Sequence, residues 1–429
     1  MSVLRTVSII FIFFCTVVAW AILGGTLVHR TDTADDFGRG AVGELWGTEQ
    51  LQVAPVFYRT VAREVEVREN ETEEGYTITD GVPVEKTKKT TTEKKLVEEY
   101  VYLEPVKSDL DVTFNLEHRQ KGLLWFSTYV ADFRSNYRIV NDTEEPMDFY
   151  VAFSFPATNA LYDDFTFRIG DEEVEFPANA ADNIVASSTL EPGEAKDVVI
   201  GYKSPGMDRW KYSFGTGVSR VRDFTLTAHT DFDDVDFPEG CVSPTAKKDR
   251  GDGWDLTWEY KDLVTGYQLG MEMPKKLNPG PIASRMSFFA PVSLLFFFTV
   301  LFIISAVKVG TVDPIHPMNY FFLAAAFFAF HLLFAYLADH INIHLTFFLS
   351  SLVSCLLVFV YVSLARSVKF AFSYATMPQL MFLVLFSYAF FYPGYTGLII
   401  TIGAIITLAV LMFATARVNW ASKFKTKES

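Results

Sequence analysis

Six long runs of apolar, uncharged residues dominate this chain of 429 residues. Each run has about 20 residues, which is the length that an α-helix needs to cross the hydrocarbon core of a bilayer. One run lies near the amino terminus and the other five follow one another near the carboxyl end. The sequence therefore predicts a membrane α-helical protein with six spans in a 1+5 order. The predicted spans are 7–28, 286–307, 318–338, 343–365, 370–391 and 396–416.

The first run, residues 7–28, also has the position of a secretory signal peptide. The apolar part of a signal peptide has about 7–15 residues and ends at a cleavage site of small residues. This run is longer and continues through Trp20 and Leu23 into Gly24. We therefore predict an uncleaved membrane anchor.

Basic residues beside the spans indicate how the chain is threaded through the membrane, because cytoplasmic loops carry an excess of Lys and Arg. In a six-span arrangement the two short loops around Asp339 and Pro393 share one side and contain no Lys or Arg. Both termini are therefore predicted to be cytoplasmic, and the long segment 31–284 lies outside the cell membrane. The basic residues on the predicted cytoplasmic side are Arg5, Lys308, Arg366, Lys369, Arg417, Lys423, Lys425 and Lys427.

Between the first and second runs, apolar residues recur at every second position, as in 165–169, 224–228 and 254–260. Such alternation between Gly, Pro, Asn and Asp turns is typical of antiparallel sheet. About 230 residues of this kind predict an all-β domain that is either a β-sandwich or a pair of smaller β units. Residues 31–50 are predicted to be a short connector, for which a helix is one option.

These patterns predict four regions. Residues 1–30 form a cytoplasmic tip and the first transmembrane helix, and 31–284 form an extracytoplasmic β-rich domain. Residues 285–417 form a five-helix transmembrane bundle, followed by a basic cytoplasmic tail over 418–429. A run of lysines is predicted to be a solvated hairpin tip, with contact to anionic headgroups as the alternative. These lysines are Lys86, Lys88, Lys89, Lys94 and Lys95.

Composition excludes several classes of protein. The net charge of −14 argues against nucleic acid as a partner, because phosphates require Lys and Arg. The three cysteines are too few for a disulfide framework or a four-cysteine zinc site, and Cys241 is the only one outside the spans. The chain has no G-x-S-x-G, H-E-x-x-H, C-x-x-C or Walker motif. We therefore predict a protein that is not an enzyme and that needs no cofactor.

Three local patterns resemble ligand sites but have a plainer interpretation. The glycines of 38–43 have dinucleotide-fingerprint spacing, yet a membrane span precedes them instead of a strand, and we predict a flexible exit from the membrane. The acidic residues of 231–239 offer carboxylate oxygens for calcium but lack EF-hand spacing, and they are predicted instead to form a loop of turn-forming aspartates. His340 and His344, beside Asp339, have the spacing of zinc ligands on a helix. They are predicted instead to mark a helix end, with Asn342 near the cap.

His331 is the one residue deep in the interior of a predicted span that titrates near neutral pH, since His344 lies at the very start of its span. A polar group in that place is a functional candidate and is expected to find an interhelical partner. No Asp, Glu, Lys or Arg lies deep in a span, which argues against a proton-coupled carrier. Pro378 predicts a kink in the fifth span. Close helix packing near the last span is predicted at Gly394, Gly397 and Gly403.

Several short segments resemble the CreD family of bacterial inner-membrane proteins. The most specific one is 315–320, in which His316, Pro317, Met318 and Tyr320 match a His-Pro-Met-x-Tyr element that joins two spans in the family. An acidic residue followed by His, at Asp339 and His340, resembles the family's outer loop. Other similar segments are Asn419-Trp420, the turn-rich run from Phe224 to Tyr260, and Gln50 to Pro55, where Ala54 departs from the Gly of the family pattern.

The resemblance implies a cell inner membrane protein that is associated with envelope integrity, with a two-component envelope regulon and with colicin tolerance when the protein is abundant. It implies no catalytic residues, and the role of the His-Pro-Met element stays open between a rigid turn and a partner or lipid site. We therefore predict a non-enzymatic protein that supports envelope integrity and stress tolerance through an acidic external β-domain. Its expected partners are membrane lipid and envelope proteins or cell-wall components. The alternative is a small channel or carrier for lipid or solute formed by the bundle, with His331, Gln379, Ser387 and Thr401 as its interior polar groups.

Overall fold

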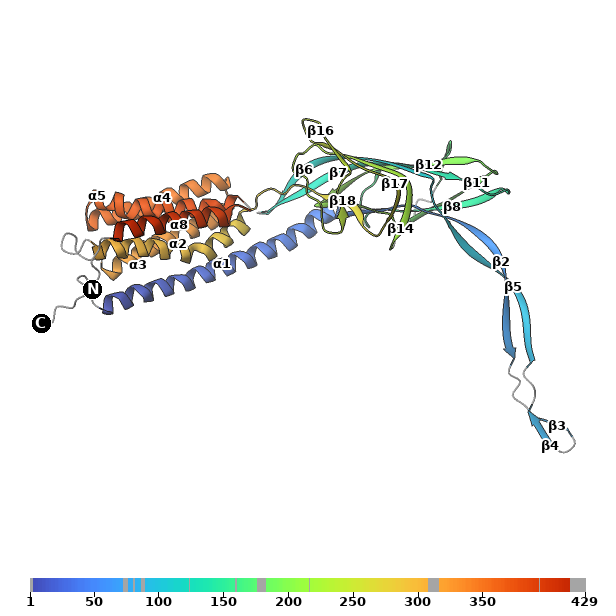
Figure 1. The fold of residues 1–429 in the computed structure, drawn as a ribbon, viewed down its shortest axis with the longest axis horizontal. Coiled ribbons are helices and arrows are strands. Elements are labelled where there is room, and N and C mark those ends of the chain that lie inside the picture. The colour runs from blue at the N-terminus through green and yellow to red at the C-terminus, as the bar shows by residue number, and fades with distance from the viewer. Residues whose placement is uncertain are drawn as a thin grey trace. The chain divides into compact units, whose positions relative to one another are not determined.

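The fold was determined as a computed structural model and consists of two compact units. The helical unit contains 1–38, 122–124 and 277–429, and the sheet unit contains 39–121 and 125–276. Each unit is described by itself (Figure 1). The structure describes residues 3–71, 76–79, 82–85, 89–122, 124–158, 160–175, 183–215, 217–307, 316–392 and 394–416. Lys86, Lys88, Lys308, Ile315, Pro393 and the segment from Arg417 onward, with Asn419 and Trp420, lie outside the described residues.

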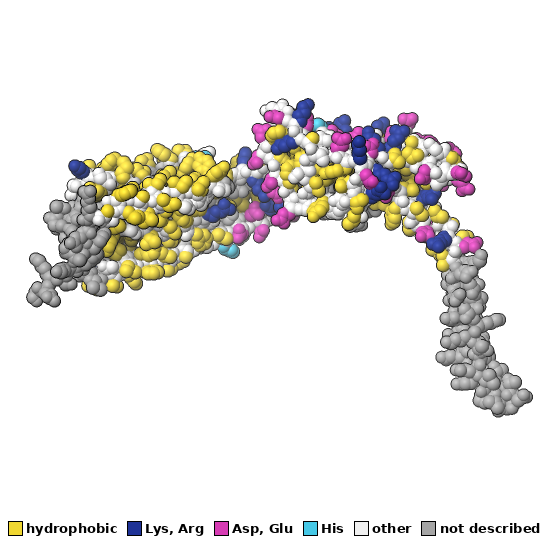
Figure 2. All heavy atoms as spheres, viewed as in Figure 1, with side chains coloured by type: hydrophobic (Ala, Val, Ile, Leu, Met, Phe, Trp, Pro, Cys, Tyr) yellow, Lys and Arg dark blue, Asp and Glu magenta, His cyan; other side chains and the backbone are white. Residues whose placement is uncertain are grey.

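Six helices in the described part of the chain are long and apolar enough to cross a membrane, as predicted. Four of them begin and end within a few residues of the expected runs, whereas the second begins earlier, at Pro279, and the first continues beyond its run. Hydrophobic side chains cover the visible face of the helical unit, whereas charged side chains of both signs are spread over the sheet unit (Figure 2). The helices are α1 (Val3–Trp46), α2 (Pro279–Val307), α3 (Pro317–Leu337), α4 (Ile343–Ala365) and α8 (Thr396–Thr415). The fifth is a composite of α5 (Val368–Phe370), η1 (Ala371–Thr376), α6 (Met377–Gln379), η2 (Leu380–Leu385), α7 (Phe386–Tyr388) and η3 (Ala389–Phe391).

Helix α1 does not end with its apolar run but continues to Trp46. The glycines of 38–43 therefore lie inside a helix, so the expected flexible exit from the membrane is wrong. The dinucleotide interpretation fails as well, because it requires a strand before the glycines. Two contacts within the sheet unit hold this last part of α1 helical despite its glycines. Val42 is buried, and Arg39 forms an ion pair with Asp208.

The glycines near the last span have different roles. A Cβ atom at Gly403 would lie 2.5 Å from the ring of Phe386, so this glycine does permit the close packing that was expected. Gly394 has a φ of 86° and forms a turn before α8. At Gly397 nothing lies within 4 Å of a Cβ position, so the expectation of close packing there is wrong.

The proline of the fifth span changes the helix in an unexpected way. Pro378 lacks an N–H group and its ring collides with the carbonyl one turn earlier, which normally kinks an α-helix. Here the backbone changes to π-helix on both sides of the proline, at η1 and η2. The wider π turns accommodate the missing hydrogen bond, and such turns occur frequently at functional sites.

The sheet unit is a large sheet-rich domain whose three main sheets enclose one hydrophobic core. Its strands show the predicted alternation, with every second residue buried over 108–114 in β6 and along the whole of β8. The sheet orders are β10-β9-β12-β7-β6-β14-β17-β16, β11-β8-β2-β5 and β1-β13-β18-β15, and β3 pairs with β4. The strands are β1 (Gln50–Val53), β2 (Val56–Glu71), β3 (Tyr76–Thr79), β4 (Val82–Glu85), β5 (Lys89–Leu103), β6 (Lys107–Lys121), β7 (Leu124–Val140), β8 (Met147–Ser154), β9 (Asp163–Ile169), β10 (Glu172–Glu173), β11 (Asn183–Leu190), β12 (Ala195–Met207), β13 (Arg209–Ser213), β14 (Ser219–His229), β15 (Cys241–Val242), β16 (Ala246–Asp249), β17 (Trp254–Thr265) and β18 (Gln268–Glu272).

Strands β2 and β5 form a long antiparallel ribbon. They pair from Phe57 with Leu103 to Glu71 with Lys89, whereas β2 pairs with β8 only over 56–58 within the described residues. The ribbon therefore extends beyond its sheet (Figure 1). This pairing agrees with a hairpin in the lysine-rich segment, although its lysine side chains lie outside the described residues.

Candidate functional site

The His-Pro-Met-x-Tyr element forms the start of α3. His316 is the N-cap residue, and its Nδ1 atom accepts a hydrogen bond from the backbone N–H of Met318 at 3.2 Å. Pro317 occupies the first helical turn, where its missing N–H costs nothing. Because Nδ1 accepts a hydrogen bond, the proton of a neutral His316 lies on Nε2.

The next residues of this element connect α3 to its neighbours. Tyr320 is buried and packs edge-on against Phe298 of α2, with ring centroids 5.0 Å apart. Asn319 accepts a hydrogen bond of 2.8 Å from the hydroxyl of Tyr361 in α4. The element therefore defines where α3 begins and how it contacts α2 and α4, which agrees with the rigid-turn interpretation.

Asp339 follows the carboxyl end of α3 and forms an ion pair with Arg30 of α1, at 3.0 Å between Oδ2 and Nη1. The carboxylate side chain is only 8% exposed, against 33% for the arginine. Burial raises the pKa of Asp339, and the charges of Arg30 and His340 oppose that rise. This pair joins the first and third helices of the helical unit.

His340 and His344 do not lie on one helix. His340 belongs to the turn after α3, and His344 lies in the first turn of α4, whose N-cap is Asn342. The side chain of Asn342 accepts a hydrogen bond from the backbone N–H of His344 at 2.9 Å. The helix-end interpretation is confirmed, and no group of metal-ligating side chains occurs among the described residues.

His331 is buried in α3, and its imidazole ring contacts the ring of Trp20 in α1. Its Nδ1 atom lies 2.9 Å from the carbonyl oxygen of Phe327, one turn earlier in the same helix. Its ring meets that of Trp20 edge-on, with centroids 5.6 Å apart. The Nε2 atom has no hydrogen-bond partner among the described residues, so the expected interhelical hydrogen bond is wrong.

A row of buried polar side chains, here called the polar seam, lies between α4 and the composite fifth helix. Thr346, Ser350 and Ser354 follow at intervals of four residues on one face of α4, and all are fully buried. Gln379 of α6 donates a hydrogen bond to Ser354 at 2.9 Å, and Ser354 donates to the carbonyl oxygen of Ala326 at 2.7 Å.

The polar seam contains polar atoms that are not paired within the protein. The hydroxyls of Thr346 and Ser350 and the Oε1 atom of Gln379 have no partner among the described residues. Of the other polar groups named above, Ser387 is buried, whereas Thr401 is exposed and bonds to Gly397 of its own helix. Thr401 therefore does not lie in the interior of the bundle, contrary to expectation.

The acidic segment 231–239 belongs to the sheet unit, and hydrogen bonds fix several of its residues. Asp231 accepts the backbone N–H of Leu116 with both carboxylate oxygens, at 3.0 and 3.2 Å. Asp236 accepts the backbone N–H of Phe237 at 2.8 Å, and the carbonyl of Asp233 accepts the indole N–H of Trp254 at 2.9 Å. These bonds fit the predicted loop of turn-forming aspartates.

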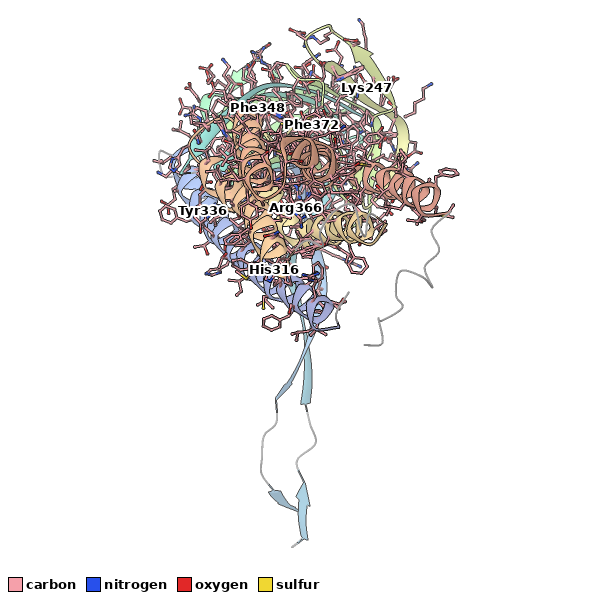
Figure 3. All side chains as sticks on the ribbon, turned by 90° about the vertical axis from the view of Figure 1, so that its left-hand side faces the viewer. Lys247, His316, Tyr336, Phe348, Arg366 and Phe372 are labelled. Carbon is pink, nitrogen blue, oxygen red and sulfur yellow. The ribbon has the colours of Figure 1, made fainter. Side chains whose placement is uncertain are left out.

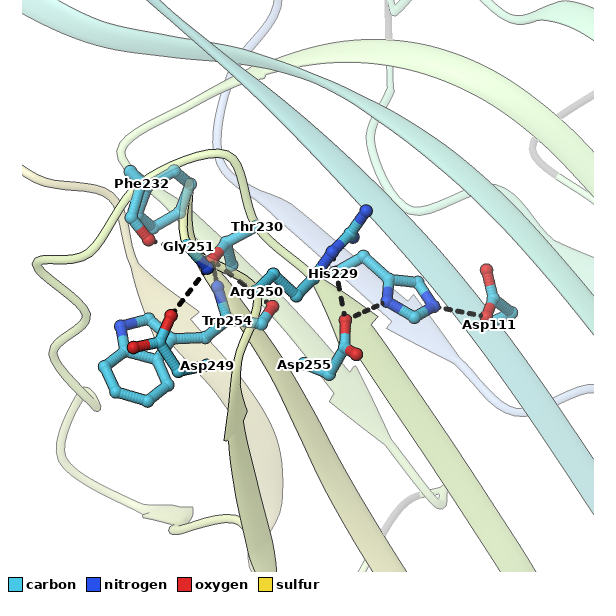
Figure 4. Close-up of polar contacts among 9 residues, drawn as sticks. All are labelled: Asp111, His229, Thr230, Phe232, Asp249, Arg250, Gly251, Trp254 and Asp255. Carbon is cyan, nitrogen blue, oxygen red and sulfur yellow. Dashed lines mark hydrogen bonds and ion pairs between the residues drawn. The ribbon is translucent and has the colours of Figure 1, made fainter.

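His229 connects three adjacent strands of the large sheet (Figure 4). Its Nδ1 lies 2.6 Å from the carboxylate of Asp255 in β17, and its Nε2 lies 2.9 Å from that of Asp111 in β6. Burial disfavours the protonated ring, but the hydrogen bonds and charges of Asp255 and Asp111 outweigh it and raise the pKa of His229. The sequence had given no sign of this cluster. Since carboxylates occupy both ring nitrogens, the geometry favours a cross-strand ion pair over a general base.

A cleft of about 570 Å³ lies in the sheet unit and is lined by strands from all three main sheets. At its base the hydroxyls of Tyr137 and Tyr212 lie 3.1 Å apart, and burial raises the pKa of both tyrosines. Tyr102 lies at the end of β5 and is 72% exposed. The walls therefore combine aromatic faces with hydroxyl groups.

Two arginines of β14 complete this cleft. Arg220 forms a bidentate pair with Asp262, at 2.9 and 2.7 Å, and Arg222 lies 3.7 Å from Glu104. Both guanidinium groups are thus oriented and balanced by carboxylates. Because a guanidinium has five N–H donors, each retains donors beyond those used in its ion pair.

The six apolar helices among the described residues, together with a large sheet-rich domain, define this chain as a multi-pass membrane protein. Residues 239–421 match the family model described as inner membrane protein CreD, so this part of the chain is similar to the family that the sequence motifs resemble. The matched range includes the end of the sheet unit and helices α2 to α8.

Other comparisons add little. No protein with a curated description matches the chain. A crystal structure of a nutrient binding protein candidate from Legionella pneumophila is similar with 9% identity and a TM-score of 0.30, and the match covers 51% of this chain and 82% of that one. A likeness at this level bears on neither the fold nor the function.

Proposed function

We propose that this chain is a non-enzymatic inner-membrane protein of the CreD type that supports envelope integrity and stress tolerance through its acidic sheet unit. Both termini are cytoplasmic in this proposal, and the sheet unit lies in the periplasm or outside the cell. The distribution of basic residues beside the spans supports that orientation. Protease added to intact spheroplasts should cut the sheet unit, and protection of this unit in intact spheroplasts would reverse the orientation.

The observation that carries the proposal is the cleft of about 570 Å³ in the sheet unit. Its volume falls in the range of ordinary ligand sites, and it combines aromatic surface with a few oriented polar groups. The two arginines are already paired with carboxylates, which favours a ligand of low net charge. An envelope component, from the cell wall or an envelope protein, is the expected occupant.

The double variant Tyr102→Ala/Arg222→Ala tests this role. Both side chains line the cleft, and Tyr102 is largely exposed, so the fold should tolerate their loss. In a deletion strain, wild-type protein should restore resistance to detergent, whereas the variant at equal abundance should restore about a tenth of it or less, as expected for two lost binding contacts.

Tyr267→Ala is the matched control, because Tyr267 is 63% exposed in the same unit and is not among the residues that line the cleft. It should behave as wild type. Full complementation by the cleft variant would contradict the proposed role of the cleft, and equal sensitivity of strains with and without the protein would contradict the proposed function itself.

A second function is favoured by the polar seam. Unpaired polar atoms inside a membrane are costly, and they occur where a helix bundle lines a path for a polar solute. The seam has no charged side chain, and the π turns on both sides of Pro378 loosen the helix that carries Gln379. This arrangement fits a channel or carrier for a small neutral solute.

Flux of glycerol into vesicles that contain the reconstituted protein tests this alternative. The Gln379→Leu variant should lower the protein-dependent flux at least about tenfold, since it removes the polar centre of the seam. Thr401→Val, on the exposed face of α8, should leave the flux unchanged. Wild-type flux equal to that of empty vesicles would exclude the channel function for this solute.

A further inference from the structure

A groove of about 570 Å³ lies between the first turns of α1 and the start of α3, within the helical unit. Its floor and walls are mainly apolar and include Val7, Phe11 and Met318, which are 54%, 67% and 50% exposed. Two groups that can carry positive charge, Arg5 and His316, belong to the same lining. The groove is therefore mainly apolar, with Arg5 on the side formed by α1 and His316 on the side formed by the start of α3.

His316 presents a defined donor in this groove. Its Nδ1 atom accepts the N–H of Met318, so the Nε2–H group of the neutral ring is a donor. Nε2 makes no hydrogen bond with any described residue. His316 also caps α3, whose N-terminal partial positive charge adds to that of Arg5 from α1. Figure 3 shows His316 close to α1 in the view along the helices.

We propose that this groove binds one phospholipid with an anionic headgroup. Its phosphate is held between Arg5 and His316, and an acyl chain lies along Val7 and Phe11. The shape requires such an amphipathic ligand, because a free phosphate would leave the exposed apolar walls uncovered. Helices α1 and α3 are both of membrane-spanning length, so phospholipid is the molecule that surrounds this surface. Basic pockets between transmembrane helices are known sites for anionic headgroups.

This proposal gives the His-Pro-Met element a second role beside its structural one. His316 caps the helix with one ring nitrogen and offers the other to a ligand, while Met318 contributes to the apolar wall. The groove shares no lining residue with the cleft of the sheet unit or with the polar seam, so the lipid site is separate from both.

The test uses the full chain in nanodiscs of phosphatidylcholine containing one tenth phosphatidylglycerol, with bound lipid counted by native mass spectrometry. Wild-type protein should retain one phosphatidylglycerol. The double variant Arg5→Gln/His316→Asn should retain it at about one tenth of that occupancy or less, because two charge-assisted or directed hydrogen bonds are lost. Asparagine is itself a favoured N-cap residue, so α3 keeps its cap in this variant.

Lys369→Gln is the control, because it removes an exposed basic residue of the same unit that is not among those lining the groove. It should retain the lipid as wild type does. Equal retention by the double variant would overturn the proposal, as would equal loss on Lys369→Gln or equal binding of phosphatidylcholine. Displacement of the bound lipid by millimolar inorganic phosphate would show that the site takes free phosphate instead.

Discussion

The Arg30→Met variant is expected to lose about 3 kcal/mol of stability at neutral pH, because it leaves the carboxylate of Asp339 buried without its cation. Arg30 also lies over the ring of Tyr336, at 5.2 Å, and bonds to the carbonyl oxygen of Ala335. Its loss therefore removes several contacts that hold α1 against the end of α3. Thermal unfolding of the full chain in mild detergent, followed by circular dichroism, measures the effect.

The stability lost in the Arg30→Met variant should depend on pH in a defined direction. Burial raises the pKa of Asp339 and Arg30 opposes the rise, so the pKa should be higher still in the Arg30→Met variant. A carboxyl group with a raised pKa in the folded state favours folding at low pH and loses that contribution as pH rises through the folded pKa. The difference in stability between the Arg30→Met variant and the wild type should thus shrink as pH falls toward about 4.

Two further variants separate the ion pair from general effects of charge. Arg30→Met/Asp339→Asn should recover much of the lost stability, because the unpaired charge is removed along with its partner. Lys369→Met changes an exposed cation of the same unit and should cost less than about 1 kcal/mol. An Arg30→Met loss as small as that of Lys369→Met would show that the pair contributes little.

The number of helices could be predicted because the length of an apolar run is a direct consequence of bilayer thickness. The end of α1 could not, since residues beyond the apolar run stay helical through contacts of Arg39 and Val42 with residues distant in the sequence. Pro378 was expected to kink its helix, whereas the π-helical turns on both sides of it could not be predicted from the sequence. Local sequence sets propensity, and packing decides between the alternatives.

The sites were less predictable than the helices. Gln379 was named as an interior polar group, but its partner Ser354 lies 25 residues away and carries no motif. The cleft is assembled from separate strands, and Tyr137 and Tyr212 meet although 75 residues separate them. In contrast, the His-Pro-Met-x-Tyr element could be recognised in the sequence, because its residues act together at the start of a single helix. Motifs report local geometry, whereas a cleft is created by the fold.

Replacement of Arg39 by methionine should destabilise the sheet unit by about 3–5 kcal/mol, the other large effect that we expect. Arg39 pairs with Asp208, whose side chain is only 8% exposed, and its guanidinium lies 5.9 Å from the centre of the Phe126 ring. Without the arginine, a carboxylate is left buried and unpaired. Urea unfolding of the full chain in detergent, followed by tryptophan fluorescence, measures the loss.

The comparison with an exposed ion pair makes this prediction specific. Arg63 and Glu99 belong to the same unit, are 3.4 Å apart and are 70% and 56% exposed, so Arg63→Met should cost less than about 1 kcal/mol. Adding Asp208→Asn to Arg39→Met should restore part of the stability, because asparagine tolerates the φ of 64° at that position and carries no charge. If Arg39→Met cost no more than Arg63→Met, the helical end of α1 would have to be held by Val42 and its neighbours. The arginine between the two glycines would then have no structural role.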